Sequence, residues 1–387
     1  MKKLFAIALL TILSTCLNFY YLGGGKMFMK KNTKNLRSLF SVFAVLGLVI
    51  TALWWGANTS TINAQAVRGT LFDFTGNGRT DFTVLTIPPA GSTDNVIWKV
   101  AGNPASPVPN QAFIRYIAYG FGTDVIVPQD YTGDRKTELA VWRPGVPGVF
   151  YISQFPTGTG GVMLDRAVPF GNTGYDPNAV GDYDGDRKID YAVARVNFGI
   201  LTYYIMSSNT NTMRQISFGI RPGADIFFVV NGADFTGDGR DEIVYFTVDA
   251  NDLTTYNTFD AVTGAGVSEV NFGNFVTDYA FTPADYTGDG RADFVAVRAG
   301  AGNTIIWYIL NPVTNTVTAT QFGIGDPDFL ANDRPLRGDY DGDGRHDIAV
   351  YRRSNQTFYY ISSQNGSLQG QKFGDPGDIP LGRFGTF

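Results

Sequence analysis

The sequence predicts an all-β fold, namely a β-propeller with six blades of about four strands each, or seven blades if the two termini build a composite one. Three observations predict it. An acidic nine-residue segment recurs six times at intervals of 51 to 57 residues, turns rich in glycine, asparagine and proline divide each interval into short strands, and an apolar run follows each acidic segment. Such runs imply strands buried on both faces, which suits sheets packed side against side around an axis.

The composition narrows the class of protein. With 44% apolar, 17% charged and 14% aromatic side chains the chain is expected to fold, which excludes disordered, collagen-like and coiled-coil proteins. Its 46 glycines and 18 prolines argue against a helical protein. One cysteine and one histidine leave few routes to a Ser-His-Asp triad, a Cys-His dyad or a zinc site. We therefore expect no conventional catalytic site and assign no catalytic residue.

Residues 1–66 form a leader that differs from the rest of the chain. They contain two apolar runs, at 4–17 and 39–55, and no acidic residue. Lys30-Lys31 before the second run and Ala64-Gln65-Ala66 after it predict an export signal cleaved after Ala66, and thus a secreted or cell-surface protein. With such a signal, the first run is explained by a start codon placed too far upstream. A two-segment membrane anchor is the alternative. Cys16 lies in the leader, so the body at 67–387 contains no cysteine.

The body is acidic. Seven of the 30 basic residues lie in the leader, so residues 67–387 hold 23 basic side chains against 35 acidic ones. Phosphate binding needs a basic surface, and we therefore exclude nucleic acid as a partner. A membrane contact is expected only through the leader, if it stays uncleaved.

Each repeat contains the same short sequence motifs in the same order. The acidic segments begin at Asp73, Asp130, Asp182, Asp234, Asp285 and Asp339. A Phe-Gly pair recurs in phase with them, as at 121–122 and 373–374, and an aromatic strand such as 150–152 or 307–309 lies between. The fourth repeat is the weakest, with only Tyr256 in the aromatic strand. We interpret each interval as one blade.

The C-terminal segment repeats a sequence motif that precedes the acidic segments. Asp378-Ile379-Pro380 matches Asp333-Arg334-Pro335, which stands just before the sixth acidic segment. The chain therefore ends on another copy of the strand with which it began, and this predicts closure of the ring.

The acidic segments are candidate metal loops, numbered one to six in chain order. Side-chain oxygens fall at positions 1, 3, 5 and 9, and position 7 offers a backbone carbonyl. Oxygen ligands alone select Ca²⁺ or Mg²⁺, and a flexible loop with many ligands favours the larger ion, so we expect up to six Ca²⁺ ions. Position 4 is always glycine, which fits a sharp turn with positive φ. Ordinary Asp-Gly turns are the alternative, which six copies of one oxygen pattern disfavour.

The loops differ in the ligands that they offer. Loops three and six carry four carboxylates each, Asp182, Asp184, Asp186 and Asp190, and Asp339, Asp341, Asp343 and Asp347. Loops two, four and five have threonine at position 3 and offer Asp130, Asp134 and Glu138; Asp234, Asp238 and Glu242; and Asp285, Asp289 and Asp293. Loop one is the weakest, with Asp73, Asn77 and Asp81. Carboxylates about 4 Å apart repel by several kcal/mol per pair, so we expect the ion to be part of the fold.

The repeat resembles the FG-GAP repeats, including the VCBS type, of integrin α-chain propellers and many exported bacterial proteins. The resemblance lies in three features, namely the Phe-Gly pair, the Asp-x-Pro strand and the loop Asp-x-Asp-Gly-Asp-Gly-x-x-Asp. The resemblance covers about residues 67–387. It implies a calcium-stabilised β-propeller with the ions in strand-connecting loops on one rim, and a role in adhesion or ligand recognition. Loop one (Thr75, Asn77), Glu138 and Glu242, and the degenerate fourth repeat depart from the pattern and weaken individual sites.

We therefore expect an exported calcium-binding propeller that acts as a binding, adhesion or structural module for an extracellular protein or glycan. The alternative is a carbohydrate-active protein, either a lectin or an enzyme like the polysaccharide lyases. Four repeats place an arginine thirteen residues after the first loop aspartate, and we expect these arginines to form ion pairs with a neighbouring blade rather than line a ligand site: Arg143, Arg195, Arg298 and Arg352. The tryptophans and tyrosines of the recurring aromatic strands are expected in the core. His346 is expected to be exposed.

Overall fold

The computed structural model describes residues 69–103, 114–156, 162–220, 225–280, 283–325 and 333–382. Contacts divide the chain between Ala64 and Gln65, and all described residues belong to the second unit, Gln65–Phe387. The predicted leader and its cleavage after Ala66 lie outside the described residues. No helix that is long and apolar enough to cross a bilayer is found in the part of the chain that the structure describes.

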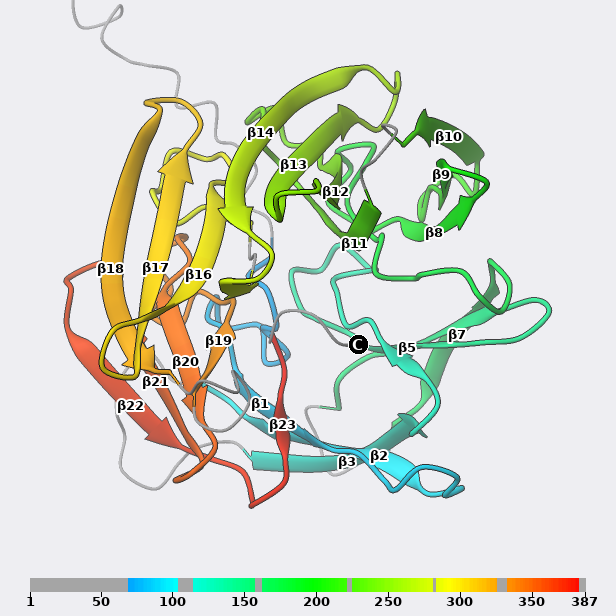
Figure 1. The fold of residues 1–387 in the computed structure, drawn as a ribbon. Helices are drawn as coiled ribbons and strands as arrows, with labels where there is room; N and C mark the ends of the chain where they lie inside the picture. Colours follow the sequence, from blue (N-terminus) through cyan, green and yellow to red (C-terminus); the bar gives the residue numbers. More distant parts are fainter. Residues whose placement is uncertain are drawn as a thin grey trace, which may run out of the picture. The chain divides into compact units, whose positions relative to one another are not determined.

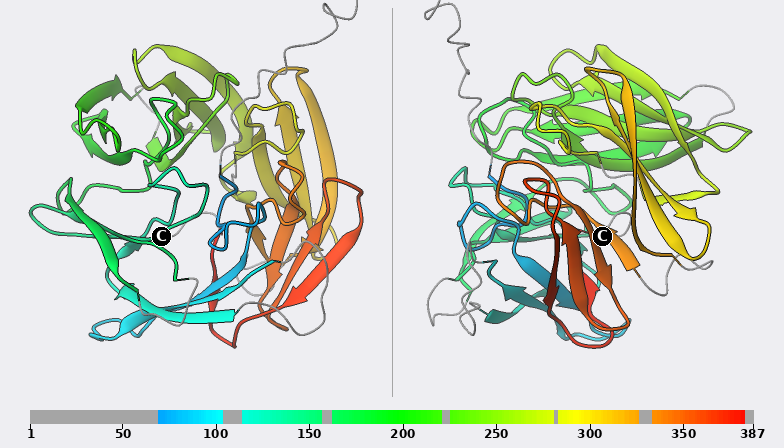
Figure 2. Two further views of the ribbon diagram at one scale, coloured as in Figure 1. Left: turned by 180° about the vertical axis from the view of Figure 1, so that it is seen from behind. Right: turned by 90° about the vertical axis from the view of Figure 1, so that its left-hand side faces the viewer.

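The second unit is an all-β propeller of six antiparallel sheets that follow one another around an axis (Figures 1 and 2). The first three sheets contain β1 (Phe82–Thr86), β2 (Asn95–Ala101), β3 (Ile114–Phe121) and β23 (Ile379–Pro380); β4 (Val125–Ile126), β5 (Leu139–Arg143), β6 (Val149–Ser153) and β7 (Leu164–Pro169); and β8 (Tyr191–Asn197), β9 (Ile200–Met206) and β10 (Met213–Gly219).

The remaining three sheets contain β11 (Asp225–Ala233), β12 (Glu242–Val248), β13 (Leu253–Asp260) and β14 (Gly266–Asn274); β15 (Asp278–Ala280), β16 (Phe294–Gly300), β17 (Thr304–Asn311) and β18 (Thr316–Ile324); and β19 (Asp333–Leu336), β20 (Ile348–Arg352), β21 (Thr357–Ile361) and β22 (Leu368–Lys372). Six blades are confirmed, and the alternative of seven is wrong. In the third blade, the single bridge between Asp176 and Ala194 stands where the other sheets have a first strand.

The C-terminal strand closes the ring. β23 pairs with β1, and Ile379 lies opposite Leu85, so strands from both ends of the second unit share one sheet. The Lys99 ammonium adds an ion pair to this sheet, at 2.8 Å from the Asp378 carboxylate and 2.7 Å from that of Asp375. The predicted closure is confirmed.

The core lies inside and between the blades. Trp98, Trp142 and Trp307 are at most 1% exposed, and Tyr256 is fully buried, which confirms their assignment to the core. One cluster joins Trp142 of β5 to Val193 of β8, so neighbouring sheets share their apolar faces. This face-to-face packing explains why the strands that follow the acidic loops are apolar throughout.

Three of the recurring arginines form ion pairs, but within their own sheets. Arg143 on β5 pairs with Asp124, which immediately precedes β4, and Arg298 on β16 pairs with Asp278 on β15. Arg352 on β20 pairs with Asp333 on β19. The expected ion pairs are confirmed for these three arginines but not for Arg195, which forms none among the described residues, and the expected placement between blades is wrong. Each arginine lies in the C-terminal half of the second strand, and its aspartate lies at the start of the first strand or just before it.

Candidate metal centres

Each acidic loop ends where the second strand of a sheet begins. Loop six, for example, follows β19 and leads into β20 at Ile348. The backbone turns with φ between 74° and 80° at the position 4 glycine of all six loops, as predicted: Gly76, Gly133, Gly185, Gly237, Gly288 and Gly342. Position 6 has positive φ too, even where it is not glycine, as at Arg135 (69°) and Arg187 (73°). All six loops therefore share one wrapped conformation.

The first aspartate of each loop is the centre of this wrap. In loop six, the amides of Gly342 and Gly344 donate to the two carboxylate oxygens of Asp339 at 2.5 and 2.9 Å. The first aspartates of the other loops accept equivalent amide hydrogen bonds: Asp73, Asp130, Asp182, Asp234 and Asp285. Each carboxylate oxygen has two lone pairs, so one amide bond still leaves it able to bind a cation.

The carboxylate at position 9 closes the loop from the other side. Asp347 accepts the amides of Tyr340 and Asp341 at 2.7 and 3.1 Å, and Glu138 accepts the amide of Tyr131 at 2.8 Å. Burial raises the pKa of these carboxyls. The pKa rises to about 8 at Glu138, to about 7 at Asp81, Asp190, Glu242 and Asp347, and to about 6 at Asp293. Their ionised forms are therefore costly at neutral pH unless a cation compensates for the lost hydration.

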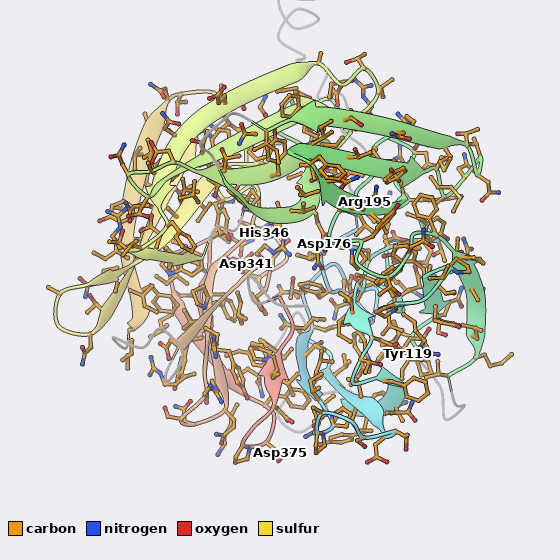
Figure 3. All side chains as sticks on the ribbon, turned by 45° about the vertical axis from the view of Figure 1, so that its right-hand side comes forward. Tyr119, Asp176, Arg195, Asp341, His346 and Asp375 are labelled. Carbon is orange, nitrogen blue, oxygen red and sulfur yellow. The ribbon has the colours of Figure 1, made fainter. Side chains whose placement is uncertain are left out.

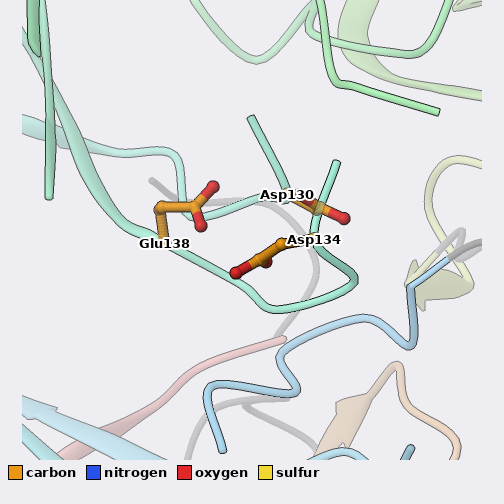
Figure 4. A group of neighbouring side chains, drawn as sticks. All are labelled: Asp130, Asp134 and Glu138. Atoms are coloured by element: carbon orange, nitrogen blue, oxygen red, sulfur yellow. The ribbon is translucent and has the colours of Figure 1, made fainter. Parts of the chain in front are cut away.

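Carboxylates converge most closely in loops two, three and six. In each, three ligand atoms lie within 4.8 Å of one another, and these come from Asp130, Asp134 and Glu138 (Figure 4); Asp182, Asp184 and Asp186; and Asp339, Asp341 and Asp347. In loop three, the second carboxylate oxygen of Asp186 is buried and has no hydrogen-bond partner. An oxygen-only cluster with such an orphaned anionic atom fits Ca²⁺. The side chains of loop three therefore have the chemistry that a Ca²⁺ site requires.

Neighbouring cations and amides hold other predicted ligands. In loop four, Nη2 and Nε of Arg240 both donate to one oxygen of Asp238, at 2.5 and 3.1 Å. In loop six, Nη2 and Nε of Arg345 likewise donate to one oxygen of Asp343, at 2.6 and 2.9 Å. In loop three, Asp190 accepts the amides of Tyr183 and Ser208. Loops one, four and five show no cluster of three carboxylates among the described residues.

Sequence reasoning missed a set of residues that hold the loop carboxylates from the end of β9, β17 or β21, or from the residue just after it. Ser207 and Ser362 donate their hydroxyls to Asp184 and Asp341 at 2.7 and 2.6 Å. The Asn311 amide group donates to Asp289 at 2.7 Å. These residues stand 21 to 23 positions after the carboxylate that they contact, and this recurring interval is the signal that would have found them.

Backbone hydrogen bonds join the six loops into a closed ring. The amide at position 8 of each loop donates to the carbonyl at position 1 of the preceding loop, and loop one donates to loop six. The six bonds are Thr80 to Asp339 (2.7 Å), Thr137 to Asp73 (2.8 Å), Ile189 to Asp130 (2.9 Å), Asp241 to Asp182 (2.8 Å), Ala292 to Asp234 (2.6 Å) and His346 to Asp285 (2.8 Å). The loops are therefore mechanically connected.

The side chain at position 7 strengthens this ring, because it covers the position 4 glycine of the preceding loop. A Cβ atom on Gly133 would lie 2.9 Å from Cγ of Lys188, and one on Gly76 would lie 2.6 Å from Cε of Lys136. The last contact, between Arg79 of loop one and Gly342 of loop six, closes the circle. Glycine at position 4 thus suits both the positive φ and the close approach of the position 7 side chain.

His346 lies in this ring and is half-buried rather than exposed, so that expectation is wrong. Its ring centroid is 5.7 Å from that of Tyr286 in the preceding loop. Burial, followed by the nearby Arg337 charge, lowers the pKa of His346 to about 3. The contact with Tyr286 follows from the backbone bond of His346 to loop five, which draws the two loops together.

Comparison with known proteins gives one family match. The family described as FG-GAP-like repeat matches residues 285–350, from the start of loop five into β20. No curated protein matches the chain.

Among solved structures, the chain is similar to a putative 6-phosphogluconolactonase from Bacteroides uniformis, with 11% identity, a TM-score of 0.40, and coverage of 78% of this chain and 97% of that one. It is also similar to the WD40 domain of coronin from Toxoplasma gondii, with 12% identity, a TM-score of 0.38, and coverage of 74% and 67%.

Proposed function

Because residues 285–350 form an FG-GAP-like repeat within a six-bladed propeller, we propose that this protein is an exported calcium-binding propeller. It acts as a binding, adhesion or structural module at or outside the cell surface. The observation that carries the proposal is the carboxylate cluster of loop three, with the buried, unpartnered oxygen of Asp186. When bound, the ion supplies positive charge at the centre of a wrapped loop that otherwise holds only anionic oxygens.

Loops two, three and six are the strongest sites, since three carboxylates already converge there. In loop three, Asp182, Asp184 and Asp186 hold the ion, and the backbone bonds to Asp182 set the shape of the cage. Oxygen ligands in a glycine-containing loop favour Ca²⁺ over Mg²⁺, which demands a stricter octahedral geometry. Loops one, four and five are weaker sites, where calcium must compete with the side-chain contacts of Asp238 and Asp289.

Export and an extracellular partner are part of the same proposal. The leader with its Ala64-Gln65-Ala66 site supports export, and extracellular calcium of about 1 mM would then keep weak loops filled. The partner is an extracellular protein or a glycan. A carbohydrate-active role has less support, because Trp98, Trp142 and Trp307 are buried and offer no stacking surface to sugars.

Calorimetry tests the metal assignment. The purified protein is stripped with a chelator and titrated with CaCl₂ and, separately, with MgCl₂. We expect heat from at least three sites with calcium and weaker binding with magnesium. At a Kd of about 0.1 mM and about 1 mM calcium, each site adds about 1.4 kcal/mol to the free energy of unfolding. The absence of calcium heat, together with a melting temperature indifferent to chelator, would refute the proposal.

A further inference from the structure

The recurring arginine of the third blade lacks the partner that the other three have. Arg143 forks Asp124 with two bonds of 2.8 Å, and Arg352 forks Asp333 in the same way. These aspartates also accept a backbone amide, from Phe121 and Ile324 respectively. This two-bond ion pair therefore holds the first strand of the blade against the second.

The third blade has the residues for this fork, but its strand register separates them. Asp176 stands nineteen residues before Arg195, as Asp333 does before Arg352. Asp176 nevertheless pairs with Ala194, through backbone bonds of 2.7 and 2.8 Å, whereas Asp333 pairs directly with Arg352. Directly opposed residues share one face of a sheet, and neighbours along a strand face opposite ways. The slip of one residue therefore places the Asp176 and Arg195 side chains on opposite faces of the sheet. Both residues are labelled in Figure 3.

The fifth blade shows that the slip alone does not break the fork. Its first strand also changes register, between Asp278 and Ala280. There the aspartate stands twenty residues before Arg298, one more than in the other blades, and the shift brings Asp278 directly opposite Arg298. In the third blade no extra residue compensates, so only Arg195 is left without its carboxylate.

Arg195 consequently keeps most of its donors free. Its Nη1 donates to the Tyr175 hydroxyl at 3.3 Å, and the guanidinium lies 5.1 Å from the centroid of the Tyr175 ring. Among the described residues Arg195 forms no ion pair, in contrast to the three forked arginines. A guanidinium has five N–H donors in a planar fork that matches a carboxylate. Tyr175 stacks on Tyr204 at 5.5 Å, which holds the platform beneath Arg195 in place.

The same hairpin carries an exposed apolar tip. Phe198, in the turn between β8 and β9, is 97% exposed, and Val196 and Ile200 on either side of the turn are 49% and 46% exposed. Phe198 has φ of 48° and is followed by Gly199 at 76°, a turn in which asparagine and glycine are favoured and a bulky residue is strained. In the corresponding turns of the last three blades, the non-glycine residues with positive φ are polar, namely Asp252, Asn303 and Gln356. Strain and exposure at one aromatic residue point to a function in binding.

We propose that one side of this tip, formed by Arg195, Tyr175, Phe198 and Ile200, binds a partner protein that presents an aspartate or glutamate carboxylate next to an apolar side chain. The carboxylate receives the free fork of Arg195, and the apolar side chain packs on Phe198. Arginine and aromatic residues are the side chains enriched in such interfaces. A sugar is disfavoured because the Tyr175 ring already contacts both Arg195 and Tyr204. This inference rests on the proposed binding role but not on calcium.

The test is titration of the purified, ¹⁵N-arginine-labelled protein with the peptide acetyl-Leu-Glu-Leu-amide, with acetyl-Leu-Gln-Leu-amide as the uncharged match. We expect the Glu peptide to shift the Arg195 Nε–H resonance with at least tenfold higher apparent affinity than the Gln peptide, and to leave the Arg352 resonance in place. Arg195→Gln and Phe198→Ser should each lower the peptide affinity at least fivefold.

Thermal melts separate binding from structure. Arg195→Gln should leave the melting temperature almost unchanged, whereas the matched Arg352→Gln should lower it, because it leaves Asp333 buried without its cation. Equal shifts with both peptides, or equal losses of melting temperature in the two variants, would overturn the proposal. A shift with glucuronate but not with the Glu peptide would also overturn it, in favour of an acidic sugar. Calcium titration of the same samples reports on the metal sites independently.

Discussion

At the scale of single residues, the loop carboxylates divide into those that shape the loop and those that are left for an ion. Asp182 accepts amides of its own loop and is needed for the wrap. Asp186 accepts the Lys188 amide with one oxygen and leaves the other buried and unpartnered. The structural and the ion-binding roles of loop three are therefore separable by mutation.

Asp186→Asn should accordingly remove calcium binding at loop three without harming the metal-free fold. In calcium we expect the variant to lose about 1.4 kcal/mol of unfolding free energy, the contribution of one site filled at about ten times its Kd. In chelator it should be as stable as the wild type or more so, because one buried negative charge is gone. Thermal melts in calcium and in EDTA measure both values. Equal losses under the two conditions would mean that Asp186 is structural.

At the scale of elements, the contact between one loop and the next depends on a glycine. Gly133→Ala introduces a Cβ at φ of 79° and 2.9 Å from Cγ of Lys188. Gly366→Ala is the matched control, because its φ is 73° but no atom lies within 4 Å of the new Cβ. Positive φ costs each variant about 1 to 2 kcal/mol. We expect Gly133→Ala to lose more stability than Gly366→Ala in denaturant unfolding, and equal losses would contradict a close contact between the loops.

The elements also show how far the sequence could predict this molecule. The spacing of the recurring sequence motifs predicts the six blades, the closing strand and the positions of the loops. The missing ion pair of Arg195 could not be predicted in this way. Asp176 precedes Arg195 by the same interval as the paired aspartates of the second and sixth blades precede their arginines, and only the strand register differs. The capture of Asp238 by Arg240 likewise depends on rotamers rather than on spacing. Contacts between loops need the ring itself, which no single repeat encodes.

At the scale of the whole molecule, the raised carboxyl pKa values predict an inverse pH dependence of stability without metal. The folded pKa is about 8 at Glu138 and about 7 at Asp81, Asp190 and Asp347, against about 4 in an unfolded chain. Between these values the folded state binds more protons than the unfolded state, so the unfolding free energy falls as pH rises. In chelator we expect a decline from about pH 4 to pH 8, and in calcium a flatter curve. Melting temperatures across this range measure both, and rising stability in chelator would be the contrary result.

The ring of backbone bonds predicts that calcium sites influence their neighbours. Loop six accepts an amide from Thr80 of loop one and donates from His346 to loop five, whereas the Ile189 bond joins loops two and three on the far side of the ring. The double variant Asp339→Asn and Asp341→Asn weakens the ion site of loop six, and an unfilled loop holds both bonds less firmly.

Hydrogen exchange in calcium measures this coupling amide by amide. We expect exchange at Thr80 and His346 to accelerate at least tenfold in the double variant. The next bonds around the ring, at Thr137 and Ala292, should accelerate less, and Ile189 should be nearly unchanged. This gradient distinguishes coupling through the ring from general destabilisation, which would accelerate Ile189 to the same extent. If instead no amide outside loop six responds, the loops bind their ions independently despite the bonds that join them.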